Sequence, residues 1–246
     1  MTHGNQRFLV IYSAVVTLVF AVSALYGFAR APQKMALEEL DVQRINFREP
    51  DGTLRLVISD KFKAPQIFVK GKEYPHPDRK TAGMIFYNDE GTENGGLIFG
   101  GERSKDGTKQ SFGHLSFDAY EQDQAMSLDS NQSGDDRHTS LRITDYPDYS
   151  IVELLNFLAS VKQLPAEQQR ERMSAFFAEH GRPTTRLVLG RGIGKDGGDN
   201  SVMLGLNDMQ GRPRIVMKVA ADGTPSLQMF DGAGNEIANL QTKGHP

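Results

Sequence analysis

An uncharged apolar segment near the N-terminus constrains this chain most. Residues 8–28, FLVIYSAVVTLVFAVSALYGF, contain no charged side chain, and Arg7 and Arg30 flank them. As a helix the segment would be roughly 30 Å long, which matches the hydrocarbon core of a bilayer. Tyr12 and Tyr26 lie about one turn from its ends, where aromatic rings favour the headgroup region. We therefore predict a transmembrane helix over residues 8–28, with the lipid bilayer as its partner.

A cleaved signal peptide is the alternative interpretation of this segment. Ala29-Arg30-Ala31 has the small-x-small form of a cleavage site. Pro32 follows it directly, however, and the apolar run is longer than the usual core of a signal peptide. We expect an uncleaved signal-anchor, and the absence of cysteine excludes lipoprotein processing.

The charges on either side of the apolar segment and the size of the following domain favour opposite orientations of the anchor. Only Arg7 precedes the segment, whereas Arg30, Lys34, Arg44 and Arg48 follow it. Positive charge tends to stay in the cytoplasm, but large domains cross a membrane largely regardless of charge. We expect a single-pass bacterial inner-membrane protein whose C-terminal domain lies outside the cytoplasm.

Composition indicates a folded domain behind the anchor. We divide the chain into a tail (1–7), the transmembrane helix (8–28), a stalk (29–41) and a β-rich domain (42–246). The stalk sequence MALEELD is compatible with a helix that continues out of the membrane. Charged residues make up 24% of the chain and hydrophobic ones 38%, which is ordinary for a folded domain. The net charge of −3 predicts no nucleic-acid partner, and zero cysteine removes disulfides and thiolate metal sites.

Short apolar alternations separated by Asp and Gly turns predict β-hairpins. Ile45 and Phe47 alternate before the turn 49–52, and Leu54, Leu56 and Ile58 alternate after it. The C-terminus repeats this pattern around turn glycines at 211, 223 and 234, and segment 51–58 resembles 210–217. Further strands are predicted at 66–70, 84–88, 97–100, 112–117, 125–129, 140–144 and 185–190.

One segment departs from the β pattern. Ser150 and Glu153 form a capping box before apolar residues at helical spacing, and Pro165 fits the first position of a second helix. The predicted fold is therefore mainly β: a meander of repeated hairpins behind a transmembrane helix, with a helical hairpin inserted at 150–180.

Two segments resemble uncharacterised bacterial single-pass membrane-anchored proteins with hairpin repeats. They are GRPRIVMKVAADGTPSLQMFDGAGNEI (211–237) and GKEYPHPDRKTAGMIFYNDEGTENGGLIFGG (71–101). The resemblance implies an anchored β domain and carries over no activity and no functional residue.

Two sequence motifs resemble ligand-binding sites but lack an element or residue that such sites require. Residues 192–197 spell G-x-G-x-x-G, but an apolar strand pattern follows them where a dinucleotide site needs a helix. Residues 129–134 place oxygen side chains like the first half of a calcium loop, yet the twelfth position is Ser140 and not Glu. We interpret the first as a turn and the second as a polar loop, and predict no metal and no cofactor.

The loop around His76 is the most distinctive polar segment. Pro75 and Pro77 stiffen it, and His76, Asp78 and Arg79 crowd at its tip. Such a group could do acid–base chemistry, but a structural connection in which Asp78 or Arg79 pairs locally is the favoured interpretation. His114, His138 and His180 show no ligand spacing, so no catalytic residue is assigned.

Three hypotheses for the function remain open. The first is a membrane-tethered, non-enzymatic binding or assembly module that contacts a protein, an envelope component or itself. The second is an envelope hydrolase that uses the loop around His76. The third is a carrier whose β domain closes around a small apolar ligand.

Overall fold

The computed structural model describes residues 3–28, 34–76, 79–192 and 200–241, and it separates into two compact units, Met1–Asp41 and Val42–Pro246. In the first unit, helix α1 (His3–Phe28) contains an exposed span, Gly4–Ala24, that is long and apolar enough to cross a membrane. This span is consistent with a single-pass anchor, and a signal sequence would have the same character.

The stalk sequence MALEELD is not helical, because residues 34–43 form no regular structure. The segment is short, and Glu38, Glu39 and Asp41 place like charges close together. Isolated helices of this length are marginal in water.

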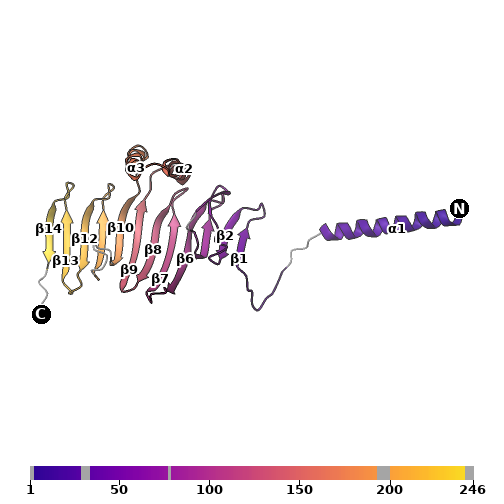
Figure 1. Cartoon of the computed structure of the whole chain (residues 1–246), viewed down its shortest axis with the longest axis horizontal. Coiled ribbons are helices and arrows are strands. Elements are labelled where there is room, and N and C mark those ends of the chain that lie inside the picture. Colours follow the sequence, from indigo (N-terminus) through magenta and orange to yellow (C-terminus); the bar gives the residue numbers. More distant parts are fainter. Residues whose placement is uncertain (1–2, 29–33, 77–78, 193–199, 242–246) are drawn as a thin grey trace. The chain divides into compact units, whose positions relative to one another are not determined.

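The second unit is mainly β. Twelve of the fourteen described strands form one antiparallel sheet, and their order in the sheet is their order in the chain. Figure 1 shows these strands side by side from β1 to β14. The strands of the sheet are β1 (Arg44–Arg48), β2 (Leu54–Ser59), β5 (Ala82–Tyr87), β6 (Glu93–Arg103), β7 (Lys109–Asp118), β8 (Gln124–Ser133), β9 (Asp136–Asp145), β10 (Thr184–Arg191), β11 (Val202–Asn207), β12 (Pro213–Val219), β13 (Pro225–Phe230) and β14 (Glu236–Gln241). The sheet is open, with β1 and β14 as its edges.

One type of turn recurs between the strands. In the turn 208–212, the Asp208 amide donates to the Arg212 carbonyl (3.0 Å), and the Gly211 amide donates to the Asp208 carbonyl (3.0 Å). Gly211 has φ +75°, a conformation that favours glycine. The same pair of hydrogen bonds closes the turns at 49–53, 88–92, 104–108, 119–123, 220–224 and 231–235. Because the loop length fixes the register of a hairpin, equal turns keep equivalent residues opposite one another.

A small hydrophobic core lies on one face of the sheet near its N-terminal edge. Leu54, Val57, Ile85 and Tyr87 are buried there. A separate hairpin, β3 (Ile67–Val69) and β4 (Lys72–Tyr74), covers them, and its Phe68 ring meets the Tyr87 ring edge-on at 5.8 Å.

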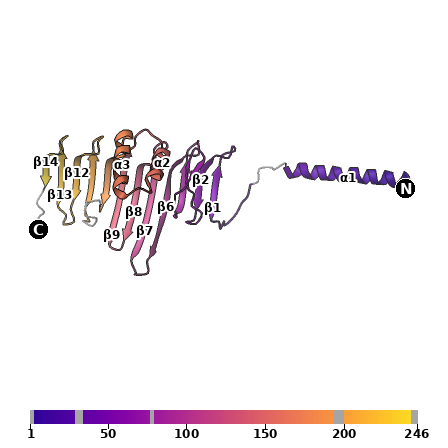
Figure 2. The ribbon, with the colours of Figure 1, turned by 45° about the horizontal axis from the view of Figure 1, so that its top comes forward.

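Helices α2 (Ile151–Val161) and α3 (Ala166–His180) follow β9 in the chain. Ser150 is the N-cap of α2, and its hydroxyl accepts from the amide of Val152. The amide of Ile151 donates to the carbonyl of Glu121 (2.7 Å), which ties the start of α2 to the turn between β7 and β8. Figures 1 and 2 accordingly place both helices at one end of the central strands.

Candidate functional site

The register of the sheet aligns apolar side chains into two rows that cross every strand. Residues directly opposite each other on paired strands share a face of the sheet, and so do residues two apart on one strand. The first row is Ile45, Ile58, Met84, Leu97, Leu115, Leu128, Leu141, Leu189, Leu204, Met217, Leu227 and Leu240. The second row is Phe47, Leu56, Phe86, Gly95, Phe117, Met126, Ile143, Leu187, Leu206, Ile215, Met229 and Ala238. We call the surface formed by these two rows the apolar face.

The apolar face is uncovered by the part of the chain that the structure describes. Gly95 is the only residue of the two rows that is buried. Leu128 at the centre of the sheet is 46% exposed, and Met217 nearer the C-terminal edge is 50% exposed. A soluble monomer rarely exposes a contiguous apolar surface of this extent, so the apolar face is a candidate binding surface.

A shallow groove lies in the middle of the apolar face. Its volume is about 560 Å³, and Leu115, Leu128, Leu141 and Leu189 contribute to its lining. Gly113, at the groove's side, has no side chain to fill it, whereas Phe99 on the neighbouring strand is 53% exposed. The face therefore combines a hollow with projecting rings, as in surfaces that interdigitate with a partner.

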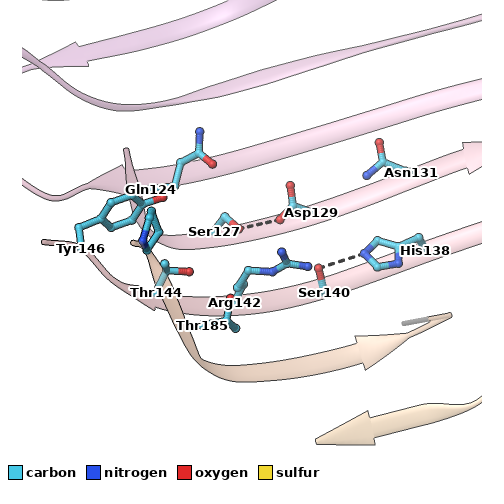
Figure 3. Close-up of a pocket in the computed structure, with 11 residues that line it drawn as sticks. Gln124, Ser127, Asp129, Asn131, His138, Ser140, Arg142, Thr144, Tyr146 and Thr185 are labelled. Atoms are coloured by element: carbon cyan, nitrogen blue, oxygen red, sulfur yellow. Dashed lines mark hydrogen bonds between the residues drawn. The ribbon is translucent and has the colours of Figure 1, made fainter. Parts of the chain in front are cut away.

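The opposite face of the central strands is polar. A cleft of about 420 Å³ lies there, and Figure 3 shows its side chains rising from β8 and β9 and from the segments that follow β9. The cleft is lined by Gln124, Ser127, Asp129, Asn131, His138, Ser140, Arg142, Thr144, Tyr146, Pro183 and Thr185.

Two hydrogen-bonded groups organise this polar cleft. The Asp129 carboxylate accepts from the Nδ1 of His114 (2.6 Å) and from the hydroxyl of Ser127 (2.7 Å). Burial raises the pKa of Asp129, but these two hydrogen bonds outweigh it and hold the pKa below its usual range. The carboxylate is thus ionised and its lone pairs are engaged within the sheet.

His138 and Ser140 resemble a nucleophile and its base, but their surroundings argue against that role. The carbonyl of Gly192 can only accept, so the Nδ1 of His138 donates to it (3.2 Å), and the Nε2 of His138 accepts from the Ser140 hydroxyl (3.3 Å). Ser140 is only 3% exposed. A hydroxyl this buried is not presented to a substrate, so the pair is structural.

The polar-loop interpretation of residues 129–134 is wrong. Asp129 to Ser133 continue strand β8, and only Gly134 and Asp135 remain between β8 and β9. The oxygen side chains alternate between the two faces of a strand, so they cannot converge on one ion as they would in a loop. Within the described ranges, no three His, Asp or Glu side chains gather as metal ligands.

A third feature is a cavity between the β3–β4 hairpin, the sheet and α2. Its volume is about 300 Å³, and it is lined on one side by Ile151, Leu154, Leu155 and Leu158 of α2. Asp118 lies on the other side, where its Oδ1 is buried without a hydrogen-bond partner among the described residues. Burial, together with the charges of Glu93 and Asp123, raises the pKa of Asp118 to about 7.

The loop around His76 borders this cavity. Arg79 makes a two-pronged ion pair with Glu93, donating from Nη1 at 2.7 Å and from Nη2. His76 also lines the cavity, and its Nδ1 is buried without a described partner. Asp78 and residues 193–197 of the G-x-G-x-x-G motif lie outside the described residues.

The sequence alone indicated no site residue, and neither Asp118 nor the apolar face was predicted from it. A single aspartate carries no signal of its surroundings, because the burial of Asp118 depends on α2 and the β3–β4 hairpin. The sequence indicated the two apolar rows only within single strands, as alternating apolar and polar residues. The missing information is the register, which joins those alternations into one surface.

No family model, curated protein or solved structure matches this chain.

Proposed function

We propose that this protein is a membrane-tethered binding or assembly module whose contact surface is the apolar face. The observation that carries the proposal is that two apolar rows cross all twelve strands and are uncovered by the described residues. Leaving such a surface in water has a large cost, since each Å² of apolar surface removed from water contributes about 25 cal/mol. A partner that covers the face recovers that free energy.

The native lack of cysteine allows a direct test. In the full chain in membranes that are open to reagent, Leu128→Cys reports on the apolar face. Arg142→Cys is its matched control, because Arg142 is exposed on the opposite face of the neighbouring strand. We expect a water-soluble maleimide to label the Leu128→Cys thiol at least about tenfold more slowly than the Arg142→Cys thiol, and equally after denaturation. Equal labelling rates in the native membrane would refute the proposal.

We propose further that α1 anchors the protein in a bacterial inner membrane, with residues 42–246 outside the cytoplasm. The length and apolar character of Gly4–Ala24 support the anchor, and large domains translocate largely regardless of flanking charge. A C-terminal fusion to a reporter that is active only outside the cytoplasm tests the orientation. A stable but inactive fusion would show that residues 42–246 lie in the cytoplasm. The N-terminal sequence of the mature protein distinguishes an uncleaved anchor from a cleaved signal peptide.

We also propose that the sheet arose by repetition of one hairpin unit, with the helices at 150–180 inserted later. The recurring turn geometry supports this, since Asn88, Asp208 and Asp231 each accept two backbone amides through Oδ1 at equivalent positions.

A hydrolase is the second candidate, and the cavity at Asp118 favours it. A carboxyl group with a pKa near 7 can donate a proton at neutral pH, and Glu93 in the same cavity is a second carboxylate. Activity of the purified chain on chromogenic esters or glycosides that Asp118→Asn abolishes would support this candidate. Activity that survives the substitution would exclude Asp118 as its acid.

A further inference from the structure

We propose that the occupant of the apolar face is the apolar face of a second copy of this chain, so that two sheets form a β-sandwich about a two-fold axis. This inference rests on the proposed function, that the face is a contact surface, and names its partner.

The size of the face matches the requirement of a stable dimer. Strands lie about 4.8 Å apart, so twelve strands extend over roughly 50 Å. Two rows with their flanking atoms are about 14–20 Å wide, because alternate residues of a strand are about 6.8 Å apart. The face therefore offers roughly 700–1,000 Å² per copy, and a standard stable interface buries about 800 Å² per partner.

The chemistry of the face suits contact with itself. A two-fold interface places the same surface patch on both partners, so a charged residue near the axis would meet its own charge. Neither row of the apolar face contains a charged side chain or a side-chain hydrogen-bonding group. A partner of another kind would need an equally apolar surface over the same length, and the second copy supplies it with the same strand twist.

The centre of the sheet would lie closest to the axis. With six strands on either side, the midpoint falls between β8 and β9. A two-fold axis that lies between the two sheets places β8 and β9 of one copy over β8 and β9 of the other. This is true whether the axis runs along the strands or across them. Leu128 of β8 and Leu141 of β9 would therefore pack near Leu128 and Leu141 of the second copy, with the sheets about 10 Å apart.

The rim of the face argues against a bilayer surface as the occupant. Asp222 and Asp231 lie in turns at the strand ends, and hydrogen bonds within those turns lower their pKa values. These ionised carboxylates, with a net charge of −3 for the chain, disfavour approach to anionic lipid headgroups.

Site-specific crosslinking of the full chain tests the second copy. Leu128→Cys and Leu141→Cys, each alone in isolated membranes, are treated with iodine, with Arg142→Cys as the matched control. Iodine is a small apolar oxidant that can enter a closed apolar interface, where it joins two neighbouring thiols as a disulfide and is reduced to iodide. We expect a covalent product of twice the chain's mass from the first two variants and none from the third. Absence of that product from both, or a product of any other mass in its place, would overturn the inference.

The mass of the detergent-solubilised chain by light scattering gives a second measurement. We expect a dimer for the native chain and for Arg142→Asp, and a monomer with an unchanged circular dichroism spectrum for Leu128→Asp/Leu141→Asp. A monomeric native chain would overturn the dimer. If Leu128→Cys is shielded from maleimide but gives no dimer crosslink, the contact surface stands and only the identity of the partner falls.

Discussion

The rings of Phe86 and Phe117 stack across strand β6, with centroids 6.4 Å apart. Both residues pair with Gly95, one from each side. Gly95 has no side chain, so the two rings close over the strand that separates them. This contact keeps the second row of the apolar face continuous where its one glycine would otherwise interrupt it.

Replacing Gly95 by alanine should destabilise the domain strongly. Gly95 has φ +122°, and an added Cβ would lie 2.2 Å from the carbonyl oxygen of Ser116. The backbone strain alone is about 1–3 kcal/mol, and the clash adds to it. Gly113→Ala is the control, since nothing lies within 4 Å of its Cβ position. Urea unfolding should show a loss of at least about 2 kcal/mol for Gly95→Ala and a change within about 1 kcal/mol for the control.

The contact between Phe86 and Phe117 should appear as a coupling free energy. A double-mutant cycle with Phe86→Leu and Phe117→Leu keeps both positions apolar and removes the ring pair. We expect a coupling of about 0.5–1.5 kcal/mol in the free energy of unfolding. Additive effects of the two substitutions would show that the rings do not stabilise each other.

Asp118 should make the stability of the domain fall as pH rises from about 4 to 7. Its pKa is raised from 3.8 to about 7, so in this window the folded protein holds a proton that the unfolded chain has released. The free energy of unfolding then decreases by roughly 2–4 kcal/mol between these limits.

Asp118→Asn should remove most of this pH dependence, because the amide stays neutral throughout. Urea unfolding at pH 4.5 and pH 8 measures the change, and Glu102→Gln, at an exposed position on β6, serves as the comparison. A native chain that is equally stable at both pH values would contradict the prediction.

Removing one partner of the Arg79–Glu93 ion pair should cost more than removing both. Their side chains are only 19% and 15% exposed, so Arg79→Met leaves a shielded carboxylate without its cation. We expect a loss on the order of 3 kcal/mol, with Arg79→Met/Glu93→Met closer to the native stability than Arg79→Met alone. Thermal unfolding at one pH of Arg79→Met, Glu93→Met and the double variant tests this prediction. A double variant that is less stable than both single variants would contradict it.

The β-rich character of the domain was predictable because alternation is a local signal. Ile45, Phe47, Leu56 and Ile58 alternate in the sequence, and they lie on one face of β1 and β2. Strand β14 was missed, since its residues are exposed and no turn glycine follows it within the described chain. The extension of β8 through Ser133 was missed because a run of polar residues in a strand has the composition of a loop, and the hydrogen bond from His114 to Asp129 is not visible in the sequence.

The openness of the apolar face could not be predicted from alternation. An apolar stripe on a strand normally indicates a side that faces a core, and this inference holds at Ile85 and Tyr87 of β5, which the β3–β4 hairpin covers. It does not hold at Leu128 or Leu189, over which no described segment lies. Whether a stripe is covered depends on which elements return across the sheet, and that is a property of topology.

The in-order arrangement of the strands has a consequence for how such a chain can change over time. Each strand of the sheet pairs only with its neighbours in that order, so a hairpin can be gained or lost at the C-terminal edge without altering any other pairing. Every hairpin gained lengthens the sheet by about 10 Å and adds two residues to each apolar row. Adding or removing one hairpin would therefore change the length of the apolar face by a fixed step.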